Sequence, residues 1–251
     1  MKIPTGELVL HGRVLPASNA TFFGDLNGTR VVYKPIAGER PLWDFPDGTL
    51  AGREVASFLV SATTGWDVVP QTWLGDGPHG AGMLQRWQEP DPDQNPVDLV
   101  SAGQAPQGWL EVFDGLDGHD RPVTLIHEDT EALRRMAVFD LLVNNADRKG
   151  GHVLPMGDGH RFGVDHGVTF HVEHKLRTVL WGWAGEPLTE DELEGVERLR
   201  VAVPGALGEA LASLVTQREI AQLVRRCERV LRDARFPEPG AEWPVIPWPP
   251  F

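Results

Sequence analysis

The stretch Asn145-Ala146-Asp147-Arg148-Lys149-Gly150-Gly151-His152 lies near the middle of the 251-residue chain, and Gly163-Val164-Asp165-His166-Gly167 follows it closely. Residues 152–156 and 161–164 read as strands, and Gly157-Asp158-Gly159 between them suits a tight turn. The pattern predicts a hairpin, which brings Asp147 and Asp165 to the same end. Two carboxylates held together at strand ends suit a proton acceptor beside a metal ligand, the arrangement that phosphoryl transfer needs.

The composition narrows the class of protein. Lys and Arg number 23 against 36 Asp and Glu, which gives a formal charge of -13. This balance argues against nucleic-acid binding and against stable association with anionic membranes, because both need cations. No apolar run has the length of a transmembrane helix, and residues 1–6 lack the apolar centre of a signal peptide. Cys227 is the single cysteine, so an internal disulfide is excluded and a cytoplasmic protein is expected.

The first part of the chain, residues 1–87, is predicted to be rich in strands. Alternating patterns and the strong hairpin turn Asn27-Gly28 indicate antiparallel pairing. Asp47-Gly48-Thr49 predicts the start of a helix with Leu50, Val55, Phe58 and Leu59 on one face. The predicted strands are residues 7–15, 22–26, 29–34, 68–74 and 81–87.

The next segment, residues 88–99, is rich in proline and acidic residues and predicts a hinge or linker. Residues 100–251 are then predicted to be mostly helical, with a short helix at 109–113 and a strong one at 130–144. Thr189 with Glu192 and Thr216 with Glu219 predict capping boxes that open two more helices. The Pro- and Trp-rich residues 236–251 are expected to lie extended on the surface. The expected fold class is therefore α+β, with a small antiparallel β-rich N-lobe and a larger, mostly helical C-lobe.

This order of elements, together with four short motifs, resembles the phosphatidylinositol 3/4-kinase-like family of the protein-kinase-like superfamily. The motifs are Val31-Val32-Tyr33-Lys34-Pro35, Gly52-Arg53-Glu54-Val55, Asp147-Arg148 and Asp165-His166-Gly167. The resemblance covers residues 7–183. More narrowly, residues 138–170 resemble a mostly actinobacterial branch known only as kinase-like.

The resemblance implies an ATP-dependent phosphotransferase with ATP and Mg²⁺ or Mn²⁺ as cofactors. It assigns Lys34, Asp147 and Arg148 to catalysis, and it pairs Lys34 with Glu54 at the nucleotide phosphates. Asp165 becomes a metal ligand, and so does His152, which stands where the family has a metal-binding Asn. Imidazole suits Mn²⁺ better than Mg²⁺, so the choice of metal stays open, and the amide of Asn145 is an alternative ligand. The remaining residues expected at the nucleotide are Ser18, Asn19 and Thr21 over the phosphates, and Met83, Leu84, Gln85 and Arg86 along the adenine.

Several readings of the function stay open. The protein is an active kinase, a catalytically weak pseudokinase that binds nucleotide, or an enzyme that transfers AMP. A metal hydrolase using His152, His171 and His174 is less favoured, because the spacing of these histidines matches no common ligand set. The expected substrate is an unknown protein or a soluble small molecule, since this acidic chain shows little of the basic and apolar surface that lipid kinases need.

Overall fold

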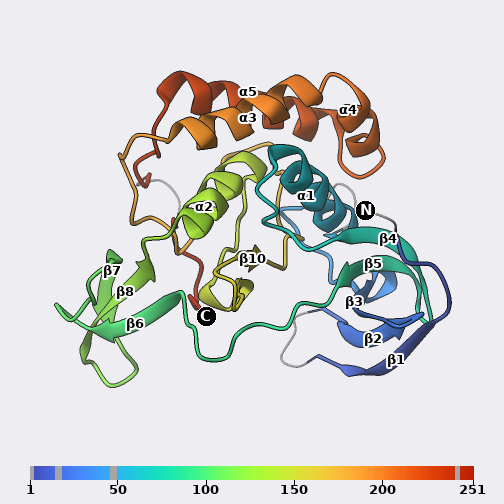
Figure 1. Ribbon diagram of the computed structural model, residues 1–251, viewed down its shortest axis with the longest axis horizontal. Helices are drawn as coiled ribbons and strands as arrows, with labels where there is room; N and C mark the ends of the chain where they lie inside the picture. Colours follow the sequence, from blue (N-terminus) through green and yellow to red (C-terminus); the bar gives the residue numbers. More distant parts are fainter. Residues whose placement is uncertain (1–2, 15–18, 46–49, 241–243) are drawn as a thin grey trace.

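The computed structural model describes residues 3–14, 19–45, 50–240 and 244–251, and it has the expected α+β architecture (Figure 1). Its N-terminal part is a five-stranded antiparallel sheet, in the order β1-β2-β3-β5-β4. The predicted β-rich N-lobe is therefore confirmed. The strands are β1 (Leu8–Arg13), β2 (Phe22–Leu26), β3 (Thr29–Pro35), β4 (Thr72–Gly77) and β5 (Gly80–Arg86).

The β2–β3 hairpin turns at Asn27 and Gly28, as the sequence predicts. Both residues have positive φ angles, 51° and 83°, and the Asp25 carboxylate accepts a hydrogen bond from the Gly28 amide at 2.6 Å. The turn sets the register of β3, which then pairs with β5 so that Lys34 lies opposite Met83. The sheet thereby carries Lys34 at the end of a strand whose neighbours are fixed on both sides.

Helix α1 (Leu50–Thr64) follows the sheet's first three strands and a short 3₁₀ turn, η1 (Ile36–Gly38). The predicted cap at residues 47–49 lies outside the described residues. Glu39, just after η1, accepts hydrogen bonds from the amides of Leu50 at 3.0 Å and Ala51 at 2.8 Å. Its carboxylate satisfies two of the free N–H groups at the helix N-terminus and places a negative charge there. A residue from the preceding turn thus anchors α1 to the sheet.

The segment after the N-lobe differs from its prediction. Residues 109–113 are not a helix, because they belong to strand β7 (Trp109–Leu116). A bulge between Glu111 and Phe113 interrupts the alternation of this strand, which hides the period of two that identifies a strand. Strand β6 begins at Val97, inside the predicted linker of residues 88–99. With β8 these strands form a separate sheet in the order β6-β8-β7, where β6 is Val97–Ser101 and β8 is Pro122–Glu128.

Helices α2, α3 and α5 of the C-lobe begin where the sequence predicts, whereas the short α4 was not predicted. Thr130 caps α2 (Glu131–Val143) by accepting from the Leu133 amide, and both capping boxes are formed. Helices α3 and α5 lie across the top of α1 and α2 in Figure 1. Their bounds, with the remaining elements, are α3 (Glu190–Ala202), α4 (Ala206–Leu211), α5 (Gln217–Asp233), η2 (Gly150–His152), β9 (Val153–Pro155) and β10 (Arg161–Gly163).

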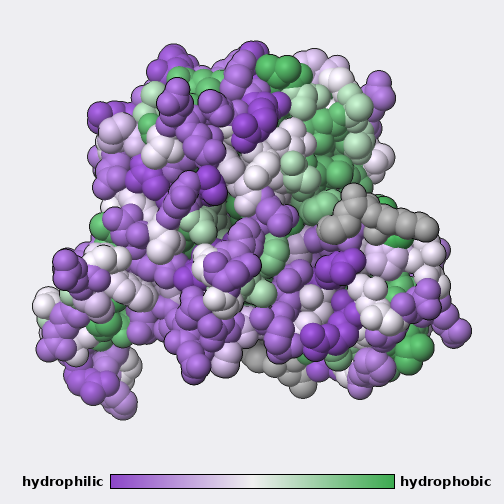
Figure 2. Space-filling view, in the orientation of Figure 1, coloured by the Kyte–Doolittle hydropathy of each residue, from purple (hydrophilic) through white to green (hydrophobic). Residues whose placement is uncertain are grey.

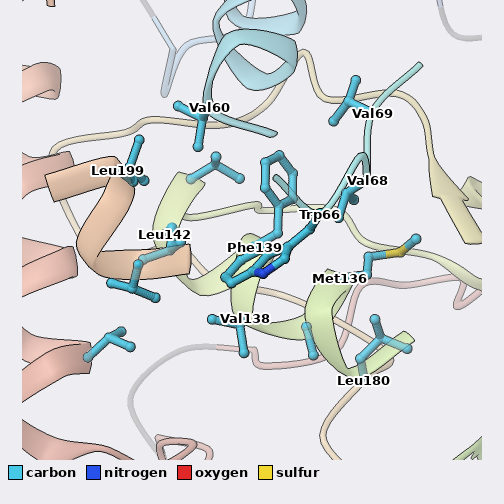
Figure 3. Close-up of a cluster of buried hydrophobic side chains, with 14 of the residues drawn as sticks. Val60, Trp66, Val68, Val69, Met136, Val138, Phe139, Leu142, Leu180 and Leu199 are labelled. Carbon is cyan, nitrogen blue, oxygen red and sulfur yellow. The ribbon is translucent and has the colours of Figure 1, made fainter. Parts of the chain in front are cut away.

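The main hydrophobic core joins α1, α2, α3 and α5. Trp66, which follows α1, and Phe139 of α2 lie at its centre, surrounded by aliphatic side chains (Figure 3). A separate, smaller cluster around Tyr33, Leu84 and Trp73 lies on the N-lobe sheet. Since α1 contributes to the main core, the helix that carries Glu54 is part of the C-lobe packing.

Residues 244–251 pack against the C-lobe, as predicted for the tail, but the chain bends at residues 246, 248 and 249 and is not extended throughout. The Val245 carbonyl accepts hydrogen bonds from the Thr178 amide and the Trp181 indole. The Pro250 carbonyl accepts from the Gly150 amide at 2.8 Å, and the Phe251 ring packs against Gly150. The tail therefore reaches the loop that follows Asp147.

The surface in Figure 2 is mainly hydrophilic, with an apolar area over the region of α1 and α4. This agrees with the 24% of charged residues in the chain. No helix in the described part of the chain is both long enough and apolar enough to cross a membrane.

Candidate active site

Lys34 lies at the end of β3 between two carboxylates from distant parts of the chain. Its Nζ atom is 2.6 Å from Glu54 Oε1 and 2.8 Å from Asp165 Oδ1. Burial acts to lower the pKa of Lys34, but the Asp165 and Glu54 carboxylates outweigh it and hold that pKa above its usual value. The Lys34 ammonium in turn holds the pKa of Asp165 well below its usual range, against the effect of burial. A charged lysine and a charged aspartate therefore face each other at neutral pH.

Glu54 connects this lysine to the segment after Asp165. Its side chain is 2% exposed, and its second oxygen, Oε2, accepts a hydrogen bond from the His166 amide at 2.9 Å. Each oxygen of the carboxylate thus has a donor, which a buried carboxylate needs. Through its two oxygens, Glu54 links α1 to β3 and to the loop after β10.

Asp165 stands at the end of the predicted hairpin, in the left-handed backbone region with φ at 62°. The β9–β10 pairing is continued by a hydrogen bond of 3.0 Å from the Val164 amide to the His152 carbonyl. His152 and Asp165 are therefore neighbours, and His152 Nε2 is 3.5 Å from Asp165 Oδ2. The hairpin brings the two expected metal ligands together.

His152 presents an unprotonated nitrogen to Asp165. Burial lowers its pKa, so the imidazole is neutral at pH 7. Its Nδ1 is 2.8 Å from the Asp147 carbonyl oxygen, which can only accept, so Nδ1 carries the proton and Nε2 carries a lone pair. A lone pair and a carboxylate oxygen that face each other at 3.5 Å suit a shared cation. Two ligands about 2.1 Å from one ion lie roughly 3 to 3.5 Å apart, so these residues fit a divalent metal.

The protein supplies two such ligands and no more among the residues described. No group of three His, Cys, Asp or Glu side chains gathers around one point there. The Asn145 amide, the expected alternative ligand, is fully buried and used elsewhere: its oxygen accepts from the Asp147 amide and its nitrogen donates to Asp140. Asn145 therefore shapes the loop and is not free to bind a metal. His171 and His174 do not form a metal site either, since His171 packs on Phe45.

Asp147 is partly exposed, at 34%, in the loop that joins α2 to η2. Its Oδ2 atom is 3.2 Å from Lys149 Nζ. The backbone at Lys149 is extended, and side chains two residues apart in an extended chain point to the same side. From the sequence alone, Lys149 is given no role. Its spacing of two residues from Asp147 is the signal that could have placed the two side chains together.

Arg148 lies beneath this loop with no exposed surface. Its guanidinium binds both oxygens of Asp140, at 2.9 Å each, and reaches the carbonyls of His152 and Val164. Buried in this way, Arg148 holds the loop and the hairpin in place and touches no site for a substrate. From the sequence alone, Asp140 is given no role in the site. Its position on the buried face of α2 is the signal that could have indicated one, because a buried carboxylate needs a partner.

His166, the middle residue of Asp165-His166-Gly167, is also buried. Its Nε2 atom accepts from Arg148 at 2.7 Å, and its ring packs edge-on against Phe139 at 5.5 Å. Burial, followed by the nearby Arg148 charge, holds the pKa of His166 well below its usual value. Neutral His166 therefore packs in the hydrophobic core and also accepts a hydrogen bond from Arg148.

The alternation of side chains along β5 divides the residues expected at the adenine between the two faces of the sheet. Met83 is the register partner of Lys34 and lies on the same face, and Gln85, two residues on, shares that face. Leu84 and Arg86 point to the opposite face, where Leu84 packs against Tyr33 and Trp73. Met83 and Gln85 therefore share the Lys34 face but are buried there, Met83 against Ala51 and Val55 of α1, whereas Leu84 and Arg86 point away from Lys34.

The loop expected over the phosphates is partly described. Ser18 lies outside the described residues. The Asn19 side chain accepts from the Arg40 amide at 3.0 Å, and the Thr21 hydroxyl donates to the Asn19 carbonyl at 3.3 Å. Both side chains stabilise the loop against its own backbone and the segment after η1.

Comparison with known proteins places the chain in a family. No family model matches it. Protein Rv2133c of Mycobacterium tuberculosis (strain ATCC 25618 / H37Rv) is 50% identical over 259 aligned positions, which cover 98% of this chain and 93% of that protein. The chain belongs to the family of Rv2133c. The phosphatidylinositol 3/4-kinase-like branch stays a prediction.

Among solved structures, the proinflammatory kinase CtkA of Helicobacter pylori superposes with a TM-score of 0.51 at 11% identity, covering 92% of this chain and 95% of that one. The likeness shows a protein-kinase-like fold. HipA of Shewanella oneidensis MR-1, solved with HipB and operator DNA, gives 13% identity and a TM-score of 0.42, over 86% of this chain and 65% of that one. That score is too low to bear on the fold.

Proposed function

We propose that this protein transfers a phosphoryl group from ATP to a hydroxyl group of a protein or a soluble small molecule. The observation that carries the proposal is the meeting of Lys34, Glu54 and Asp165, which come from β3, α1 and the loop after β10. A fixed cation beside a carboxylate in a protein-kinase-like fold is what binding of nucleotide phosphates and their metal requires.

The nucleotide-binding half of the proposal concerns charge. Lys34 would contact phosphate oxygens with its ammonium, held in place by Glu54. Asp165 and His152 would hold a divalent ion, Mg²⁺ or Mn²⁺, that neutralises charge on the transferred group when bound. The nitrogen ligand favours Mn²⁺, because Mg²⁺ prefers oxygen.

The transfer half concerns Asp147. Its partly exposed carboxylate would accept the proton of the substrate hydroxyl while that oxygen forms a bond to the γ-phosphorus, and the bond from this phosphorus to the bridging oxygen of ADP breaks. Lys149, 3.2 Å from Asp147, is placed to contact the transferred group as negative charge gathers there. Arg148 would act through the loop that it holds.

Calorimetry of ATP binding with Mg²⁺ and with Mn²⁺ tests the binding half. We expect metal-dependent binding in the wild type, its loss in Lys34→Met and Asp165→Asn, and its retention in Asp147→Asn. Glu111→Gln, on an exposed position of β7, is the control. Absence of binding with either metal would overturn the proposal.

Mass spectrometry after incubation with ATP tests the transfer half, beginning with the protein itself as acceptor. Addition of phosphate that disappears in Asp147→Asn supports the kinase. Addition of AMP would replace it with nucleotidyl transfer, and binding without any transfer to a panel of acceptors would replace it with a nucleotide-binding module.

A further inference from the structure

Arg53, the residue before Glu54 in α1, is a buried charge with partners on two other segments. Its guanidinium is 2.6 Å from Glu219 Oε1 and donates to the Thr169 carbonyl at 2.6 Å. The side chain is 2% exposed, and the guanidinium lies over the Phe45 ring, 5.1 Å from its centroid. A cation buried this deeply is stable in the fold only with its partners in place.

Glu219 is itself fixed, because it belongs to the capping box that opens α5. Its Oε2 atom accepts from the Thr216 amide at 2.8 Å and from the Thr216 hydroxyl at 2.9 Å. The remaining oxygen, Oε1, accepts from Arg53. Arg53 is therefore attached to a rigid helix end and not to a mobile side chain.

The other partner of Arg53 leads back to the candidate site. Thr169, whose carbonyl accepts from Arg53, donates its hydroxyl to the His166 carbonyl at 2.8 Å. Ser57, one turn further along α1, is within 3.3 Å of the same hydroxyl. Two consecutive residues of α1 thus hold both ends of the segment after Asp165: Glu54 holds the His166 amide, and Arg53 holds the Thr169 carbonyl.

We propose that Arg53 is a positioning residue that fixes α1 in the rotation that turns Glu54 toward Lys34 and Asp165. Rotation of α1 away from Lys34 would take Arg53 out of its contacts with Glu219 and Thr169 and leave buried charges unpaired. The lysine, glutamate and aspartate are therefore held together by the α5 terminus, with no separate activating event. This inference rests on the proposed function for its effect on catalysis, but its structural part does not.

The fold contains a matched control for this ion pair. Arg134 of α2 binds Glu192, the corresponding capping-box residue of α3, at 2.9 Å. Arg134 also lies over aromatic rings, at 4.8 Å from Phe236 and 5.7 Å from Trp183. Its partners include none of the residues proposed to bind nucleotide. The two pairs share their chemistry and differ in location.

The test compares Arg53→Met with Arg134→Met, read by hydrogen exchange of the His166 amide and by affinity for ATP with metal. We expect Arg53→Met to speed exchange at His166 roughly tenfold or more and to weaken ATP binding by a similar factor, and Arg134→Met to leave both within roughly twofold. Arg53→Lys, which keeps a charge for Glu219, should recover part of the loss. Equal effects from the two arginines would overturn the proposal.

A second pair of variants covers the case in which the single substitutions do not fold. Arg53→Met/Glu219→Leu and Arg134→Met/Glu192→Leu remove both charges of each pair, which leaves no buried ion unpaired. The same contrast in His166 exchange and ATP affinity is expected. If the wild type binds no ATP, the proposed function fails, while the exchange measurement still decides whether Arg53 positions the segment after Asp165.

Discussion

Arg148 donates to both carboxylate oxygens of Asp140, at 2.9 Å from each, and neither side chain has exposed surface. The pair joins the last turn of α2 to the loop that carries Asp147. Both partners are fully buried, so substituting one of them should show how much a buried ion pair near the site affects the free energy of unfolding.

We expect Asp140→Asn to destabilise the fold by about 3–5 kcal/mol, because the Arg148 charge would stay buried without a counter-charge. Denaturant unfolding measures the change. Asp191→Asn, which breaks the half-exposed pair with Arg135, should cost less than about 1 kcal/mol. Equal costs would show that burial does not decide the strength of these pairs.

Lys149→Met should slow phosphoryl transfer about 10²-fold while leaving ATP affinity nearly unchanged. The cation lies beside Asp147 and not beside the Lys34 group, so its loss affects the transition state more than nucleotide binding. Single-turnover transfer and calorimetry measure the two quantities. Arg218→Met, at an exposed position of α5, is the control. A loss of affinity equal to the loss of rate would contradict this role.

Gly150→Ala should destabilise the protein by about 1 kcal/mol or less, because the added methyl group would overlap the half-exposed Phe251 ring and displace it from its packing against Gly150. Removing that ring in Phe251→Ala should relieve the overlap, so the double variant should be more stable than the sum of the single effects predicts. Thermal unfolding of the four proteins closes the cycle. Trp248→Ala is the control, because Trp248 lies in the same tail but is 80% exposed, and it should leave the stability unchanged. If the effects of Gly150→Ala and Phe251→Ala on stability simply add, Phe251 does not contact Gly150.

His127 should make stability depend on pH. It accepts from the Gly182 amide through Nε2 and donates to the Glu128 carbonyl through Nδ1, so it is neutral in the fold. Burial lowers its pKa, while the unfolded chain takes up a proton near pH 6.5; stability is therefore full above that pH and is lost as pH falls.

The slope assigned to His127 is at most about 1.4 kcal/mol per pH unit. His127→Gln keeps an acceptor and a donor without the titration, so unfolding free energies between pH 7.5 and 5.5 should vary less in this variant than in the wild type. His119→Gln, at an exposed turn, should leave the slope unchanged. An unaltered slope in His127→Gln would contradict the assignment.

Local patterns predicted the elements that depend on neighbouring residues. The Asn27-Gly28 turn, the two capping boxes and the hairpin between His152 and Asp165 are all encoded within a few residues and are confirmed. The fold class followed from the order of these elements. The helix predicted at residues 109–113 was wrong. These residues belong to strand β7, and a bulge in it interrupts the alternation that identifies a strand from sequence.

Long-range contacts could not be predicted from a single sequence. The pairing of Lys34 with Glu54 was expected from family resemblance alone, since no periodicity joins residues on different elements. The contact of Arg53 with Glu219 spans most of the chain and has no local signature. Arg148 has none either: an Asp-Arg dipeptide says nothing about which carboxylate will meet the arginine in the core.

The hydrogen bond from the Gly150 amide to the Pro250 carbonyl has a consequence for the order in which the site forms during synthesis. The chain emerges from the ribosome with its N-terminal segments first and folds as it emerges. Lys34, Glu54, Asp147 and Asp165 are all translated well before Pro250. A nascent chain can therefore assemble its charged centre once α5 and its Glu219 have been made, yet the loop beside Asp147 obtains its last backbone partner only when the tail has followed.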